Sequence, residues 1–132
     1  MAEPLSPDPV DAKRILVVDD DRDICTALSL ALRAQGYEVE TAAGGHEALR
    51  RLGPFRPDLV ILDIMMPGMD GFAVFQAITE RVEGRLPFLF ITATALRVGE
   101  EWLRGIPHAT MHKPLDFDLL FERVHQLLSA SK

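Results

Sequence analysis

The sequence contains little cysteine and no long hydrophobic run. A single cysteine among 132 residues excludes an internal disulfide and a cysteine-rich metal cage, which fits a reducing cytoplasm. No apolar stretch approaches the roughly 20 residues of a membrane-spanning helix. The first residues, MAEPLSPDPVDA, also lack the basic and apolar regions of a signal peptide. We therefore predict a cytoplasmic protein without a membrane partner.

Positive charge is also scarce. Fourteen Lys and Arg residues against 20 Asp and Glu residues give a formal net charge of −6 and a pI of about 5.1. This balance argues against a nucleic-acid partner. The 48% hydrophobic and 26% charged content is that of an ordinary globular domain. Residues 1–12 hold three of the nine prolines and little to bury, so we predict a flexible lead-in there and one domain over residues 13–130.

Short apolar runs alternate with helical patterns along the domain. Continuous apolar runs at 15–18, 59–62 and 88–91 predict strands buried on both faces. Residues 37–42 alternate between apolar and polar, which predicts an edge strand, and residues 109–112 are predicted to form a short last strand. Helical patterns occur at residues 22–35, 46–52, 72–82, 96–104 and 115–128. Five alternations predict an α/β fold: a flavodoxin-like, doubly wound parallel sheet of five strands in the order 2-1-3-4-5, with five helices.

Polar side chains stand at the ends of four of these strands. Asp19 and Asp20 end the first strand, Asp63 the third, Thr92 the fourth and Lys113 the fifth. In the order 2-1-3-4-5 the first and third strands are neighbours, and ligands bind at the carboxyl edge of such a sheet. We therefore expect all five side chains to converge on one edge.

That set of groups predicts phosphate chemistry. Three crowded carboxylates repel one another unless a cation neutralises them, and oxygen ligands without a Cys or His cluster favour Mg²⁺. Lys113 and Thr92 suit phosphoryl oxygens. Asp63 stands alone at the end of the central strand and is the better nucleophile for an aspartyl phosphate, whereas Asp19 and Asp20 look like the metal pair.

Each residue also has a simpler interpretation. An Asp at a strand end commonly caps the next turn, and adjacent acids before a helix serve as N-caps, which we expect of Asp21. A Lys-Pro pair can merely end a strand. Only the combination of these residues, in this order at successive strand ends, is poorly explained by turn chemistry.

The motifs together resemble the response-regulator receiver domain of two-component signalling. They are ILVVDD at 15–20, LDIMMPGMDG at 62–71, Thr92-Ala93 and Lys113-Pro114, and the resemblance covers residues 13–130. It implies that Asp63 is the phosphoacceptor. It further implies that Asp20, Asp63 and the backbone carbonyl of Met65 bind Mg²⁺ directly, with Asp19 acting through water.

The same resemblance implies a switch hydroxyl at Thr92 and a phosphate-binding lysine at Lys113. The phosphoryl donor would be a histidine kinase or a histidine phosphotransfer protein. Such a domain transfers phosphate to itself and sheds it, rather than acting as a turnover enzyme. Because the chain ends just after the last helical pattern, we expect a stand-alone receiver whose output is a downstream protein target.

Two features bear on output and lifetime. Receivers usually carry Tyr or Phe three positions before the lysine, where this chain has Thr110, and Gly99 interrupts the fourth helical pattern. We therefore expect phosphorylation to alter the face formed by residues 95–113, with Thr110 a bystander. Met65 and Thr94, two positions beyond Asp63 and Thr92, offer no acid or amide to orient water, which predicts slow self-dephosphorylation.

Two other functions compete with this interpretation. A phosphorylation-independent interaction module with the same fold would be expected to lack an acid, the Thr or the Lys, and none is missing. A haloacid-dehalogenase-type phosphohydrolase needs a second Asp two positions after the nucleophile, where Met65 stands.

Overall fold

The computed structural model describes residues 12–66, 69–82, 84–93 and 105–130. The main strands are β1 (Arg14–Val18), β2 (Glu38–Ala42), β3 (Leu59–Asp63), β6 (Phe88–Thr92) and β7 (His108–His112). Two short strands, β4 (Met65–Met66) and β5 (Met69–Asp70), pair with each other. The helices are α1 (Arg22–Ala34), α2 (Gly45–Phe55), α3 (Gly71–Arg81) and α4 (Phe117–Ala130).

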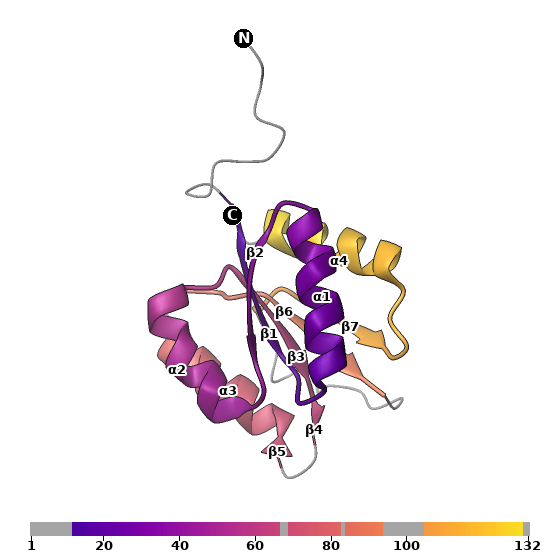
Figure 1. The fold of residues 1–132 in the computed structure, drawn as a ribbon. Helices are drawn as coiled ribbons and strands as arrows, with labels where there is room; N and C mark the ends of the chain where they lie inside the picture. The colour runs from indigo at the N-terminus through magenta and orange to yellow at the C-terminus, as the bar shows by residue number, and fades with distance from the viewer. Residues whose placement is uncertain (1–11, 67–68, 83, 94–104, 131–132) are drawn as a thin grey trace.

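The five main strands form one parallel sheet in the order β2-β1-β3-β6-β7. This is the predicted order 2-1-3-4-5, so the predicted fold class is confirmed. Helices α1 and α4 cover one face of the sheet and α2 and α3 the other (Figure 1). The predicted helix over 96–104 and residues 1–11 of the predicted lead-in lie outside the described residues.

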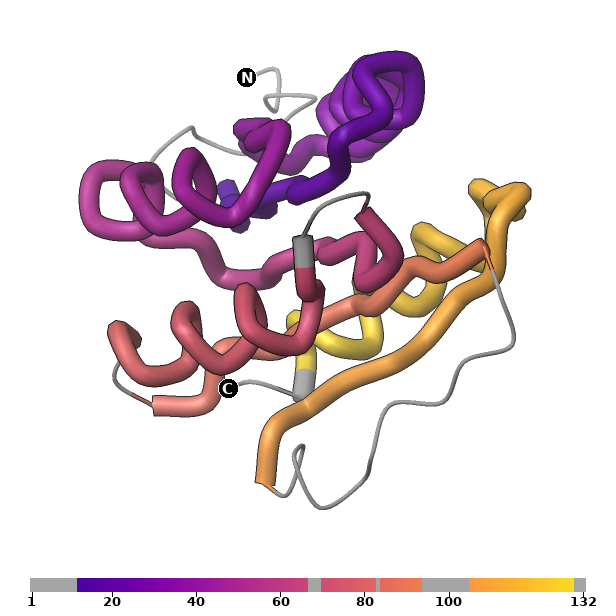
Figure 2. The backbone as a smooth tube through the Cα atoms, turned by 90° about the horizontal axis from the view of Figure 1, so that it is seen from below, coloured from indigo at the N-terminus to yellow at the C-terminus, as the bar shows by residue number. Residues whose placement is uncertain are grey.

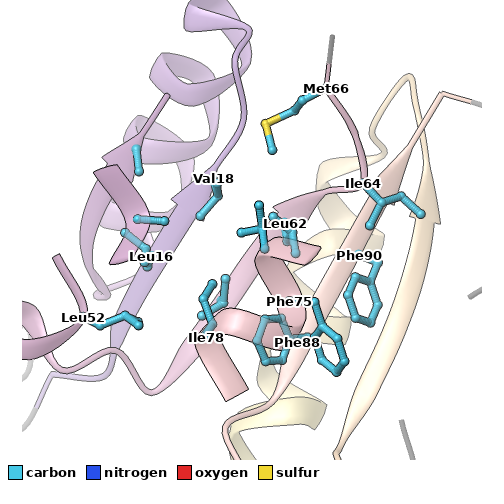
Figure 3. Packing of buried hydrophobic residues seen from close by; sticks show 14 of the residues in the cluster. Leu16, Val18, Leu52, Leu62, Ile64, Met66, Phe75, Ile78, Phe88 and Phe90 are labelled. Atoms are coloured by element: carbon cyan, nitrogen blue, oxygen red, sulfur yellow. The ribbon is translucent and has the colours of Figure 1, made fainter. Parts of the chain in front are cut away.

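The core explains why the central strand is apolar up to Asp63. All five residues of β3 are buried because helices pack on both faces of the sheet. On the α2–α3 side, the ring of Phe75 stands edge-on to Phe88 and Phe90, with centroid distances of 4.7 and 5.5 Å (Figure 3). Such aromatic pairs add about 0.5–1.5 kcal/mol each beyond their buried area. The rigid core fixes where β3 ends.

The ends of the described helices lie within two residues of the predicted bounds, except for the end of α2. Asp21 caps α1 by accepting hydrogen bonds from the N–H groups of Asp23 and Ile24, as predicted. Helix α2 runs past the predicted end at residue 52, through Pro54 to Phe55. Phe55 is 5% exposed, and its burial in the core sustains this last turn although Pro54 donates no hydrogen bond.

The short β4–β5 pair was not predicted from the sequence. Met65 pairs with Asp70 and Met66 with Met69 in an antiparallel ladder. The Asp70 carboxylate then caps α3 by accepting the N–H of Phe72 at 2.9 Å. Two-residue strands carry almost no hydrophobic pattern, which is why sequence periodicity misses them. The pair holds the chain that leaves Asp63 close to the start of α3.

Candidate functional site

The three predicted carboxylates meet at the carboxyl edge of the sheet. Strands β1 and β3 are direct neighbours, so Asp19 and Asp20, which follow β1, lie beside Asp63 at the end of β3. One carboxylate oxygen from each lies within 4.8 Å of the others. Asp19 and Asp63 are 1% and 3% exposed, whereas Asp20 faces solvent. Two buried acids and one accessible acid therefore line one small site.

Backbone N–H groups orient both buried carboxylates. Asp63 Oδ1 accepts the N–H of Met65 at 2.9 Å, and Asp19 Oδ1 accepts the N–H of Asp21 at 2.9 Å. Both contacts are Asx turns, in which an Asp side chain binds the backbone two residues later. The simpler interpretation, that Asp63 caps the next turn, is thus correct for one of its oxygens. The Oδ2 atoms of both acids remain directed at Lys113.

Lys113 bridges the two buried acids. Its Nζ donates a hydrogen bond to Asp63 Oδ2 at 3.0 Å and lies 3.2 Å from Asp19 Oδ2. The Lys113 N–H donates to the carbonyl of Thr92 at 2.8 Å, which aligns the ends of β7 and β6. Burial alone would lower the pKa of Lys113, but its hydrogen bonds and charge contacts with Asp63 and Asp19 raise it. Lys113 therefore carries the positive charge of the site.

Asp19 is held in an unfavourable environment for an anion. Burial raises its pKa above the usual range, and the charge of Asp63 raises it further, against the lowering effects of the Asp21 N–H and Lys113. Its buried Oδ2 atom has the 3.2 Å ion-pair contact with Lys113 Nζ, but that contact falls outside hydrogen-bond geometry among the described residues. A hard divalent cation would supply the missing positive charge, so the oxygen-only donor set fits Mg²⁺.

A contact that the sequence did not reveal supports the Asp19 loop. The Cys25 thiol on α1 donates to the backbone carbonyl of Asp19 at 3.2 Å. Burial raises the pKa of Cys25 to about 11, and the nearby charge of Asp19 adds to that rise. The thiol therefore stays protonated and acts as a donor at neutral pH. No sequence signal marks such a six-residue contact, because it depends on how α1 packs.

The remaining predicted residues are placed as follows. Thr92 is fully buried at the end of β6, in the strand next to Asp63. Met65 follows the site with its side chain 47% exposed. Thr110 is exposed on β7, a strand at the outer edge of the sheet (Figure 2). Thr94 and Gly99 lie outside the described residues. The structure thus gathers Asp19, Asp20, Asp63 and Lys113 in direct proximity.

With this geometry established, known proteins identify the class. The response regulator receiver domain family matches residues 15–125. A CheY-like receiver domain protein from Methanospirillum hungatei superposes with a TM-score of 0.81 at 28% identity, covering 92% of this chain and 97% of that one. The chain belongs to the response regulator receiver family of two-component signalling.

Two further relatives bear on ligand and context. The response regulator TrrA from Thermotoga maritima, solved in complex with Mg²⁺-BeF, is 36% identical with a TM-score of 0.73, over 87% of this chain and 98% of that one. The transcriptional regulatory protein ZraR from Salmonella typhimurium is 38% identical over 89% of this chain. This chain spans only 27% of ZraR and about a third of the other curated relatives.

Within the described part of the chain, no helix is both long enough and apolar enough to cross a membrane.

Proposed function

We propose that Asp63 accepts a phosphoryl group from a phosphohistidine of a histidine kinase or histidine phosphotransfer protein. The observation that carries this proposal is the buried Asp63 carboxylate, held between Lys113 and the Asp19–Asp20 pair. A carboxylate oxygen of Asp63 forms a bond to phosphorus as the N–P bond of the donor breaks. The electron pair stays on the imidazole nitrogen, which takes up a proton.

The residues around Asp63 have distinct roles in this step. Asp20, Asp63 and the carbonyl of Met65 would hold Mg²⁺ directly and Asp19 through water, and the bound ion would neutralise the developing phosphoryl charge. Lys113, already 3.0 Å from Asp63, pairs with a phosphoryl oxygen after transfer. The hydroxyl of Thr92, on the neighbouring strand, donates to another.

A groove of this chain next to the Asp63 site could receive the donor protein. A groove of about 210 Å³ runs beside Lys113, between α1 and the segment that leads into α4. Its walls are apolar and include Ile24, Leu28, Pro114 and Phe117. An apolar groove beside the acceptor lets a helical partner bind without adding charge to an acidic site. We assign this groove to the phosphohistidine donor.

Phosphorylation itself is directly measurable. Treatment with a small phosphodonor and Mg²⁺ should give one species heavier by a single phosphoryl group in the intact mass. The species should be absent in Asp63→Asn and with EDTA in place of Mg²⁺, because the first lacks the nucleophile and the second the cation. A modification that survives Asp63→Asn would contradict Asp63 as the acceptor, and a wild-type protein that takes up no phosphoryl group would favour the interaction-module alternative.

The phosphorylated state should decay slowly. Met65 is half-exposed directly after the Asp63 turn and offers no group that orients a water for in-line attack. Met65→Asn supplies an amide at that position and should speed decay by roughly tenfold, since positioned polar groups contribute at least that much. Mass spectrometry after donor removal measures the rate. An unchanged rate in Met65→Asn would show that this side chain does not control the lifetime.

Output is proposed to use the face formed by residues 95–113. Its described part includes β7, where His108, Thr110 and His112 are exposed along the sheet edge. Phosphorylation must favour one state through differential contacts. Hydrogen exchange with and without beryllofluoride should show changed protection within residues 95–108. Changes confined to the loops around Asp19 and Asp63 would place the output elsewhere.

A further inference from the structure

A second recessed surface lies at the opposite end of the sheet from Asp63. It is a hollow of about 780 Å³ where α2 and α3 end and β3 and β6 begin. Asp58, in its wall, precedes Asp63 by the length of β3, which is about 16 Å. We call this surface the arginine hollow; its wall includes Leu52, Arg56, Asp58, Arg81, Arg85 and Pro87.

The arginine hollow has the opposite charge to the protein as a whole. Arg56 follows α2, and Arg81 and Arg85 lie on the stretch from the end of α3 toward β6, whereas the whole chain carries a net charge of −6. The acid of the wall, Asp58, already accepts the backbone N–H of Arg14 at 2.8 Å. Glu83, between Arg81 and Arg85 in the sequence, lies outside the described residues. A local cluster of guanidinium groups on an acidic protein attracts anionic groups to this one place.

Two of the three arginines have an ordinary structural explanation. Arg81 stands in the last turn of α3, where a cation interacts favourably with the helix carbonyls. Arg85 donates from Nη1 to the carbonyl of Gly105 at 3.2 Å, which ties the loop before β6 to the loop before β7. The contact with Gly105 orients the side chain of Arg85, and neither explanation accounts for the third arginine, Arg56.

The backbone of Arg56 ends α2 by donating its N–H to the carbonyl of Leu52 at 2.9 Å, but this role does not explain why an arginine stands there. Arg56 follows α2 in the left-handed conformation, with φ 54° and ψ 67°, and is the one non-glycine residue with positive φ in the described chain. Glycine or asparagine normally occupies this position at a helix end. A strained residue whose side chain lines a recess indicates a functional constraint. Arg56 is therefore the residue that points to a ligand.

We propose that the arginine hollow binds an acidic segment of a partner protein. Guanidinium groups pair with carboxylates through two parallel hydrogen bonds, and three of them match several acids rather than a single ion. The wall also includes the apolar residues Leu52, Leu86 and Pro87, which fit apolar side chains interspersed among the acids. Because the hollow is about 16 Å from Asp63, a partner bound there leaves the phosphorylation site open.

A labelled peptide of alternating Glu and Leu residues tests the proposal by fluorescence anisotropy. Wild type should bind it at low salt, and added salt should weaken binding because ion pairs are screened. Arg56→Gly should weaken binding at least fivefold, and the triple variant Arg56→Gly/Arg81→Gln/Arg85→Gln should abolish it. Arg50→Gln removes an exposed arginine of α2 that is not in the wall, and should bind like wild type.

The Arg56→Gly variant separates a binding role from a structural one. Glycine adopts the left-handed conformation without strain, so the thermal unfolding midpoint of Arg56→Gly should not fall although the variant loses peptide binding. Beryllofluoride, which mimics phosphorylation of Asp63, should leave the affinity for the peptide unchanged. Peptide binding can therefore fail or succeed independently of phosphorylation. Equal binding by wild type and the triple variant would overturn the proposal. Binding of ATP but not of the peptide, with the same arginine dependence, would overturn it in favour of a small phosphorylated ligand.

Discussion

Lys113→Met should destabilise the metal-free protein by about 2–3 kcal/mol at pH 7. Methionine has a similar length and fills the same space, so the change mainly removes one positive charge. Lys113 Nζ lies 3.0 Å from Asp63 and 3.2 Å from Asp19, both of which are almost fully buried. Without the charge of Lys113, the buried carboxylates of Asp63 and Asp19 have no compensating cation. The estimate is at the low end because the Lys113 side chain is 20% exposed.

The stability lost in Lys113→Met should be larger near neutral pH than in acid. The pKa of Asp19 is raised in the folded protein, so its ionisation opposes folding as pH rises through that pKa. Removing Lys113 takes away a contact that lowers the Asp19 pKa and therefore strengthens this opposition. The difference between Lys113→Met and wild type should be largest near neutrality and should shrink as pH falls toward the ordinary Asp pKa of about 3.9. Saturating Mg²⁺ should also reduce it.

Urea unfolding in EDTA measures the effect, and two variants control it. Lys13→Met removes an exposed lysine just before β1 and should change stability by less than about 0.5 kcal/mol. The double variant Lys113→Met/Asp63→Asn should recover part of the loss, because one buried charge is removed with its partner. Equal stability of Lys113→Met and wild type at pH 7 in EDTA would mean that Lys113 does not compensate the two acids.

Much of this site could be predicted because it is made of strand ends. Apolar runs before Asp19, Asp63 and Thr92 locate the strand ends in the sequence, and the strand order places those ends along one edge. Proximity then follows from topology without any knowledge of side-chain packing. The same logic placed Lys113 beside Asp63, 50 residues earlier in the chain.

Other features were missed because they depend on packing or on backbone conformation. The Cys25 contact with Asp19 depends on the position of α1, and the β4–β5 pair is too short for a periodic pattern. The helical pattern predicted to end at residue 52 continues through Pro54 because Phe55 is buried. The left-handed Arg56 could not be found either, since arginine gives no sequence signal for positive φ. Each of these four features depends on tertiary contacts, which override the local propensity that can be read from the sequence.

Gly71→Ala should destabilise the protein by about 3 kcal/mol and should also slow phosphorylation of Asp63. A Cβ at position 71 would overlap Ile64 Cα and would lie 2.8 Å from the Ile64 carbonyl oxygen. These are backbone atoms, so no side-chain rotation relieves the clash, and the start of α3 must move away from the end of β3. Ile64 directly follows Asp63, so the same shift disturbs the carboxylate. Urea unfolding and intact-mass phosphorylation rates measure the two effects.

Gly53→Ala is the matched control, because a Cβ at that position in α2 meets nothing within 4 Å. Alanine favours the helix by up to about 1 kcal/mol, but Pro54 follows and restricts the helical conformation of the residue before it. The two effects oppose each other, so stability should stay within about 0.5 kcal/mol of wild type and phosphorylation should be unchanged. If Gly71→Ala were as stable as Gly53→Ala, close contact between Gly71 and Ile64 would not be what fixes the Asp63 loop against α3.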